Sequence, residues 1–275
     1  MEEILKAILL GVVQGLTEFL PISSTAHLRI IPSFFGWKDI GASYTAVIQV
    51  GTMIAIIVYF WKDMMNMTAS FISSLRSKDF TGKDTRLFLA IILGTIPIVI
   101  LGFLFKDLIR NQFRNMYIVA SSLIFFSIIL YIADRFTKKT VTMDKLKLSD
   151  GIFVGFFQAL ALIPGASRSG STISGAFFKN MTREDAARFS FLLSIPAVLL
   201  SGLYELFSQR NTLLSGESAI LSLLIATVVS GIVGYWSIGF LLGFIKKHSL
   251  TLFVIYRILF GMIIIILLST KIISN

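Results

Sequence analysis

The sequence predicts an all-α polytopic membrane protein with six transmembrane helices, two re-entrant helical hairpins and an inverted-topology repeat. The first observation is the composition, which is 55% hydrophobic and only 15% charged, whereas soluble domains carry about 25% charged residues. The second is the recurrence of long apolar runs. The third is a pair of further apolar segments that break at a proline and continue into small hydroxyl residues. A single integral membrane domain over 1–275, surrounded by bilayer lipids, is therefore expected.

Six apolar runs are long enough to cross a bilayer, which takes roughly 17–25 helical residues. The stretch at 4–22 is not read as a signal sequence, because Glu18 and Pro21 interrupt it and acidic rather than basic residues precede it. It is expected to remain in the protein. The six predicted spans are 44–61, 87–106, 117–136, 187–208, 219–243 and 251–271.

Basic residues predict the orientation, because loops rich in Lys and Arg stay cytoplasmic. The connections on one side hold 15 Lys and Arg and those on the other side hold 8, so both termini are expected outside. The net charge of +10 serves this orientation, and no nucleic-acid partner is expected. The chain has no cysteine, which excludes a disulfide, a thiolate nucleophile and a thiolate metal site. The basic connections are 62–86, 135–150, 179–188 and 244–249.

Two segments, about 1–43 and 151–178, remain without a full crossing in this scheme. Each is expected to enter and leave the membrane by one face. Each contains a proline break, at Pro21 in the first and at Pro164 in the second. Broken backbone at membrane depth is tolerated where it lines a polar cavity. Both segments are therefore predicted to be re-entrant hairpins.

The two re-entrant segments resemble each other in sequence. G-V-V-Q-G-L at 11–16 aligns with G-F-F-Q-A-L at 155–160 at an offset of 144, and 21–24 matches 164–167 after a one-residue gap. The alternative is chance similarity between two glycine-rich apolar segments. Inverted repeats commonly meet near the bilayer midplane at a binding site. The predicted repeat halves are about 1–136 and 150–275.

The first polar motif runs from Gln14 to His27. Gln14 and Glu18 stand four residues apart and share one helix face. A carboxylate in an apolar segment is costly and usually functional, although Glu18 at a helix end could instead reach the interface. A carboxylate, hydroxyls and an imidazole together supply the parts of an activated-nucleophile site. The candidate catalytic residues are Glu18, Ser24 and His27, and the candidate substrate contacts are Gln14, Ser23 and Thr25.

The second polar motif is P-G-A-S-R-S-G-S-T at 164–172. Its glycines let backbone N–H groups approach an anion, and a helix starting near Gly170 would aim its positive end at a phosphate. Arg168 adds a planar fork that suits phosphate oxygens; a structural ion pair with Glu18 is the alternative. Gln49 either lines the cavity or bonds across helices. Arg168 is a further candidate catalytic residue, and the candidate substrate-binding residues are Gln49, Gly165, Ser167, Ser169, Gly170 and Thr172.

Two more charged residues lie within apolar spans, Glu205 and Arg257. Both are expected near helix ends or in structural pairs.

The two motifs resemble the signatures of the bacterial undecaprenyl-diphosphate phosphatase family associated with bacitracin resistance. The resemblance is carried by residues 11–28, 49–52 and 164–172 and covers nearly the whole chain. It implies hydrolysis of undecaprenyl diphosphate to undecaprenyl phosphate and inorganic phosphate in the bacterial plasma membrane. It further implies that the monophosphate product is the carrier lipid of cell-wall synthesis and that bacitracin competes for the prenyl diphosphate substrate. The oligomeric state stays open, a homodimer included.

The resemblance also implies roles for single residues. Glu18 matches the second acidic residue of the family's first motif, Ser24 its proposed nucleophile, His27 its histidine, and Arg168 its phosphate-binding arginine. A divalent cation, Mg²⁺ or Ca²⁺, is expected to assist, with Glu18 as a ligand. Gln14 stands where many members have glutamate, which leaves Glu18 as the only carboxylate in the motif.

A rival function comes from the same architecture. An inverted repeat with broken helices at the midplane is also typical of transporters. A lipid-phosphate transporter or flippase could use the second motif for anion binding without needing Ser24 or His27. Release of phosphate by the purified protein separates the two functions.

Overall fold

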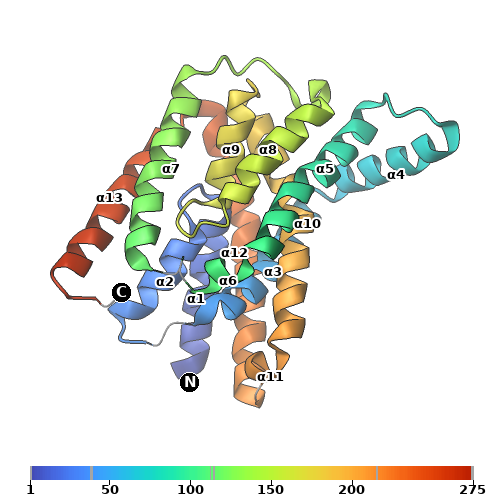
Figure 1. The fold of residues 1–275 in the computed structure, drawn as a ribbon. Helices are drawn as coiled ribbons and strands as arrows, with labels where there is room; N and C mark the ends of the chain where they lie inside the picture. Colours follow the sequence, from blue (N-terminus) through green and yellow to red (C-terminus); the bar gives the residue numbers. More distant parts are fainter. Residues whose placement is uncertain (1, 38–39, 112, 114, 215, 274–275) are drawn as a thin grey trace.

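The computed structural model describes residues 2–37, 40–111, 113, 115–214 and 216–273 (Figure 1). Within this part of the chain the regular elements are helical. They are α1 (Glu2–Phe19), α2 (Ser24–Phe34), α3 (Gly41–Tyr59), α4 (Trp61–Ser77), α5 (Lys83–Leu104), α6 (Lys106–Asn111), α7 (Met116–Phe136), η1 (Met143–Lys145), α8 (Leu148–Leu160), α9 (Arg168–Phe178), α10 (Arg183–Ser208), α11 (Arg210–Leu213), α12 (Glu217–Lys247) and α13 (Thr251–Ser269).

The six predicted spans are confirmed as helices. Among the described residues, α3, α5, α7, α10, α12 and α13 are long and apolar enough to cross a membrane. Large apolar side chains also cover the outside of the bundle, where Trp236 is 76%, Phe136 75% and Phe207 73% exposed. An apolar outer surface of this kind needs lipid around it. The chain is therefore a multi-pass membrane protein.

The connection 62–86 was predicted as a loop, and this prediction is wrong for most of it. Helix α4 starts at Trp61, directly after α3, and ends at Ser77. Its buried face includes Met67 and Ser74, while Trp61 is 56% exposed. Polar residues on the other faces dilute the apolar signal, so a search for membrane-length runs passes over a short amphipathic helix.

The four basic connections gather at one end of the bundle. Helices α1 and α13 begin and end, respectively, at the opposite end (Figure 1). The orientation predicted from the Lys and Arg counts requires these four connections to lie on the same side of the membrane. The contacts that join the connections are the backbone bridge between Val141 and Met181, the ion pair between Arg188 and Asp63 at 3.0 Å, and the 2.8 Å hydrogen bond from the Leu250 N–H to the Asp134 carboxylate.

Two helix pairs are broken by short non-helical turns, α1–α2 at 20–23 and α8–α9 at 161–167. In each pair the second helix is capped by a serine with positive φ, 75° at Ser23 and 69° at Ser167. The Ser23 hydroxyl accepts from the Ala26 N–H at 3.4 Å, and the Ser167 hydroxyl accepts from the Gly170 N–H at 3.2 Å. The two caps are 144 positions apart, which is also the offset at which 11–16 aligns with 155–160.

Glycines bring the first helix of each pair against a long spanning helix. A Cβ built on Gly11 would lie 2.6 Å from the Ala226 carbonyl oxygen of α12, and one built on Gly155 would lie 2.2 Å from the Gly94 carbonyl oxygen of α5. Small residues at such contacts let helix backbones approach closely in membranes. The positions of α1 and α8 are therefore set by backbone contact with α12 and α5.

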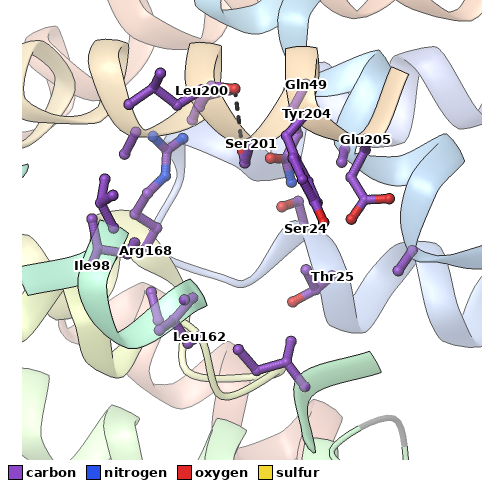
Figure 2. A pocket seen from close by; sticks show the side chains of 18 of the residues that line it. Ser24, Thr25, Gln49, Ile98, Leu162, Arg168, Leu200, Ser201, Tyr204 and Glu205 are labelled. Carbon is purple, nitrogen blue, oxygen red and sulfur yellow. Dashed lines mark hydrogen bonds between the residues drawn. The ribbon is translucent and has the colours of Figure 1, made fainter. Parts of the chain in front are cut away.

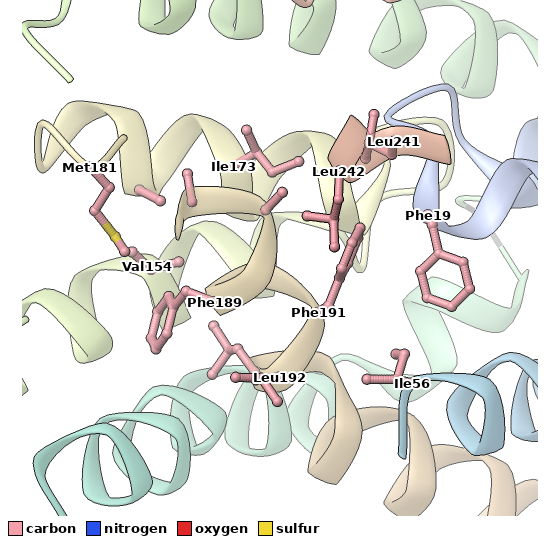
Figure 3. Packing of buried hydrophobic residues seen from close by; sticks show 14 of the residues in the cluster. Phe19, Ile56, Val154, Ile173, Met181, Phe189, Phe191, Leu192, Leu241 and Leu242 are labelled. Carbon is pink, nitrogen blue, oxygen red and sulfur yellow. The ribbon is translucent and has the colours of Figure 1, made fainter. Parts of the chain in front are cut away.

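The largest buried cluster surrounds the first half of α10 (Figure 3). Phe189, Phe191 and Leu192 of α10 pack there with Val154 of α8. The ring of Phe19, at the end of α1, meets Phe191 edge-on with centroids 5.2 Å apart. This packing holds the end of α1, and with it the neighbouring Glu18, against the centre of the bundle.

Gly155→Ala tests the close approach of α8 and α5. The added methyl group meets backbone atoms of Gly94 rather than a flexible side chain, so α8 must shift. We expect a loss of about 1–3 kcal/mol, as for overpacked cores, visible as a lower midpoint of thermal unfolding in detergent. Gly243→Ala is the control, because a Cβ there has no neighbour within 4 Å. Equal midpoints for the two variants would contradict the contact.

Candidate active site

A cavity of about 540 Å³ lies between the two turns and the helices α3, α5 and α10 (Figure 2). Its walls are mainly apolar. They carry Ile98 of α5, Leu162 of the second turn and Leu200 of α10. A polar group of side chains is gathered on one part of the wall. Seven predicted site residues line the cavity: Glu18, Ser23, Ser24, Thr25, Gln49, Ser167 and Arg168.

A buried ion pair between Arg168 and Glu18 joins the two polar motifs. The Arg168 Nη2 donates to Glu18 Oε1, and the two side chains are 15% and 4% exposed. The Nη1 of Arg168 has no hydrogen-bond partner among the described residues. The guanidinium therefore keeps a donor that a phosphate oxygen can use.

The other Glu18 oxygen organises the first motif. Oε2 accepts from the Ser24 hydroxyl at 2.6 Å and from the Gln14 amide at 2.8 Å. A hydroxyl that donates to a buried carboxylate has the arrangement of a nucleophile and its base. Gln14 does not reach the cavity wall. Gln14 was predicted to contact the substrate; in the structure its amide holds Glu18 from behind the cavity wall.

The structure does not bring His27 to the cavity or to Ser24. Its Nδ1 lies 2.8 Å from the Ser23 carbonyl oxygen, and its Nε2 lies 2.6 Å from the Tyr256 hydroxyl. The imidazole also stacks on Phe260, with centroids 4.5 Å apart. Tyr256 was not among the predicted residues, and its half-exposed position in a spanning helix offered no sequence signal.

The remaining predicted residues of the second motif lie in its turn or in the first turns of α9 and do not line the cavity. Gly165 has φ 93°, and its N–H donates to the Thr25 hydroxyl of the first turn at 3.4 Å. Ser169 donates to the Leu20 carbonyl at 3.3 Å. Helix α9 begins at Arg168, two residues before the expected start near Gly170, whose N–H is capped by Ser167. Thr172 lies within α9 and donates to the Arg168 carbonyl at 2.8 Å.

Arg257 of α13 connects the two turns from behind, and its assignment to a helix end or a structural pair is wrong. The side chain is fully buried. It donates to the carbonyl oxygens of Pro21 at 3.3 Å, Gly165 at 3.0 Å and Ala166 at 2.9 Å. An arginine inside an apolar span is itself a signal of a functional site, but its partners are carbonyls that no sequence pattern identifies.

Glu205 lies in the last turn of α10, as was expected of a helix end, and its side chain also lines the cavity (Figure 2). Its Oε2 accepts from the Ser43 hydroxyl at 2.8 Å. Among the described residues, no group of three or more acidic or histidine side chains could hold a metal ion. The two carboxylates that the cavity offers a cation are therefore Glu18 and Glu205, and oxygens from substrate and water would have to complete its coordination.

Known proteins match this chain over almost its full length. A family model described as bacitracin resistance protein BacA matches residues 7–263. A protein of Chloroherpeton thalassium named undecaprenyl-diphosphatase is 49% identical, with 97% of each chain covered. Proteins with the same name from Prosthecochloris aestuarii and Chlorobaculum tepidum are 45% and 44% identical, with 96% of this chain and 97% of each relative covered.

Replacing Arg257 by Ala tests its connection of the two turns. The change leaves buried carbonyl groups without donors, which costs about 1–3 kcal/mol for each group. We expect a clearly lower midpoint of thermal unfolding in detergent. Arg210→Ala is the control, because that side chain is exposed and donates to the Phe207 carbonyl at the end of α10, away from both turns. A midpoint equal to wild type for the Arg257 variant would show that the turns hold without it.

Proposed function

The chain belongs to the bacitracin resistance protein BacA family, and we infer from this membership that it hydrolyses undecaprenyl diphosphate to undecaprenyl phosphate and inorganic phosphate. It is a membrane hydrolase that recycles the carrier lipid of cell-wall synthesis, and bacitracin resistance goes with the family. The observation that carries the site assignment is the contact of Ser24 and Arg168 with one carboxylate, Glu18, on a cavity wall.

The cavity has a polar part and an apolar part, which match the diphosphate and the prenyl chain of the substrate. The diphosphate is placed at the polar group, where Arg168 and the Ser24 and Thr25 hydroxyls donate to its oxygens. The first prenyl units are placed along the apolar wall that includes Ile98 and Leu200. This arrangement keeps the apolar chain in an apolar environment and uses buried polar groups only for phosphate.

The proposed chemistry starts at Ser24. Glu18 accepts the hydroxyl proton while Ser24 Oγ bonds to the terminal phosphorus and the bond from that phosphorus to the bridging oxygen breaks. Undecaprenyl phosphate leaves, and water then releases inorganic phosphate from Ser24. In the alternative, Glu18 activates a water that attacks the phosphorus directly. In both, Arg168 stabilises the charge on the phosphoryl oxygens, which is the main catalytic effect in phosphoryl transfer.

A divalent cation, Mg²⁺ or Ca²⁺, is part of the proposal. Glu18 would be its ligand from the first motif, and Glu205 is the second carboxylate on the same cavity wall. Diphosphate oxygens and water would supply the other ligands, as is usual for Mg²⁺. Such an ion would neutralise charge on the diphosphate.

We also propose that the two broken helix pairs are re-entrant and that the halves of the chain form an inverted repeat. The serine caps with positive φ and the glycine contacts recur at the same offset. The contacts between the halves are also reciprocal. Helices α1 and α3 of the first half pack on α12 of the second half, and α8 and α10 of the second half pack on α5 of the first half. In Figure 1 the pair α1–α2 occupies one end of the bundle and α8–α9 the other. These observations support a pseudo-two-fold axis between the turns.

The cavity is proposed to face the outside of the plasma membrane, together with both termini. Its lining residues come from the first half of α3, the last third of α5 and the second half of α10, and also from α6. Each of these parts is remote from the basic connections, which join the other ends of the helices. Bacitracin is proposed to compete for the diphosphate on this side.

Arg168→Ala tests the phosphate-binding arginine. Removing the guanidinium takes away charge stabilisation in the transition state, so we expect release of phosphate from farnesyl or undecaprenyl diphosphate to fall by at least about 100-fold. Arg76→Ala, an exposed arginine of α4, is the control for loss of a positive charge. Near wild-type release by the Arg168 variant would sink the site assignment. No release by the wild-type protein would instead favour the transporter.

Ser24→Ala distinguishes attack by Ser24 from attack by a water that Glu18 activates. Because the Ser24 hydroxyl already donates to Glu18, we expect a loss of about 1000-fold or more in kcat, as for removal of other enzymatic nucleophiles. Residual activity within about tenfold of wild type would instead point to an attacking water. A trapped phosphoserine after acid quench of the wild-type protein would support Ser24 independently, and Ser33→Ala is a matched control on α2.

A further inference from the structure

Both ring nitrogens of His27 have hydrogen-bond partners, the Ser23 carbonyl and the Tyr256 hydroxyl. The Ser23 carbonyl can only accept, so the hydrogen in the 2.8 Å contact belongs to Nδ1. In the neutral imidazole Nε2 is then an acceptor, and the Tyr256 hydroxyl donates to it at 2.6 Å. The ring is 6% exposed as a residue and stacks on Phe260. The Ser23 carbonyl therefore sets its tautomer, and Tyr256 and Phe260 of α13 set its orientation.

The Ser23 carbonyl that His27 binds controls the position of Ser24. Ser23 has φ 75°, a conformation that non-glycine residues rarely adopt. Its carbonyl accepts from the His27 backbone N–H at 3.3 Å and from Nδ1 at 2.8 Å. Because the peptide group is planar, fixing this carbonyl also fixes the N–H and Cα of Ser24. The Ser24 hydroxyl is thereby aimed at Glu18 Oε2, 2.6 Å away.

The second turn offers a comparison within the same chain. Ser167 adopts nearly the same φ, 69°, and Ser171 stands where His27 stands in the first turn. The Ser171 N–H donates to the Ser167 carbonyl at 2.9 Å, but its hydroxyl has no hydrogen-bond partner among the described residues. A turn of this shape therefore forms without an imidazole. Of these two turns, only the one next to Ser24 has a side-chain hydrogen bond to the carbonyl of its capping serine, from the His27 imidazole.

We propose that His27, held by Tyr256, is a positioning residue that aims Ser24 through the Ser23 carbonyl and exchanges no proton in the reaction. The proposal rests on the proposed function, because the aim of Ser24 matters only if Ser24 and Glu18 act on the diphosphate. It assigns a role to Tyr256 as well, since the hydroxyl donor leaves Nδ1 as the nitrogen that carries hydrogen.

Two amide substitutions at position 27 distinguish a positioning role of His27 from a role in proton transfer. His27→Asn places an N–H donor where Nδ1 lies and cannot titrate, whereas His27→Gln places its donor further out, where Nε2 lies. We expect the Asn variant to keep kcat within about tenfold of wild type and the Ala and Gln variants to lose about 100-fold, as for a misplaced reacting group. KM should stay unchanged in all three. Tyr256→Phe should lower kcat with the pH profile unchanged.

The pH profile of kcat/KM provides the second readout. For the Asn variant we expect the wild-type profile with both limbs retained, because no titrating group of the reaction has been removed. Loss of a limb, or an Asn variant as inactive as the Ala variant, would overturn the positioning role and make His27 the acid or base. His248→Asn is the matched control. Thermal unfolding of each variant checks that the fold is retained.

The Arg168→Ala variant keeps the two proposals distinguishable. If it turns over like wild type, the proposed site fails, whatever the His27 variants show. If it is inactive and the Asn and Ala variants at position 27 lose the same activity, only the positioning role fails.

Discussion

The ion pair between Glu18 and Arg168 is the contact on which the arrangement of the site depends. A single charge in the interior of a membrane protein is costly, and a buried pair compensates each charge with the other. Here the two charges lie at the end of α1 and at the start of α9, 150 residues apart in the chain, so pairing them also brings the adjoining turns together. Arg257 strengthens this junction from the opposite side through its bonds to three carbonyls. The two turns are thus held between two buried guanidinium groups.

Rigid packing around the junction explains how a broken backbone keeps its geometry. Gly11 and Gly155 place α1 and α8 directly on the backbones of α12 and α5, and the α10 cluster holds Phe19, the neighbour of Glu18, in place. Ser23 and Ser167 adopt their unusual φ values within this frame. Glu18, Ser24 and Arg168 therefore lie at helix ends that border the irregular turns. Such rigid positions suit a site that must hold polar and charged groups at set distances.

Gln14 illustrates how a departure from the family pattern fits the site. Its amide donates to Glu18 Oε2, which already accepts from Ser24. A glutamate at this position would place a second negative charge against Glu18 and against an incoming diphosphate unless a cation or a proton lay between them. With Gln14, one carboxylate and one guanidinium form a neutral pair, and the negative charge of the substrate is the main charge added to the cavity.

The sequence by itself determined the six spans, the grouping of the basic connections, the two polar motifs and the family, because hydropathy, loop charge and signature motifs are read along the chain. It also indicated Arg168, Glu18 and Ser24 as partners in one site. Only the tertiary structure decided that Ser24 donates to Glu18, that Arg257 holds both turns, and that His27 faces Tyr256 instead of the cavity. These contacts depend on the register between helices far apart in sequence, and backbone contacts at glycines and core packing set that register.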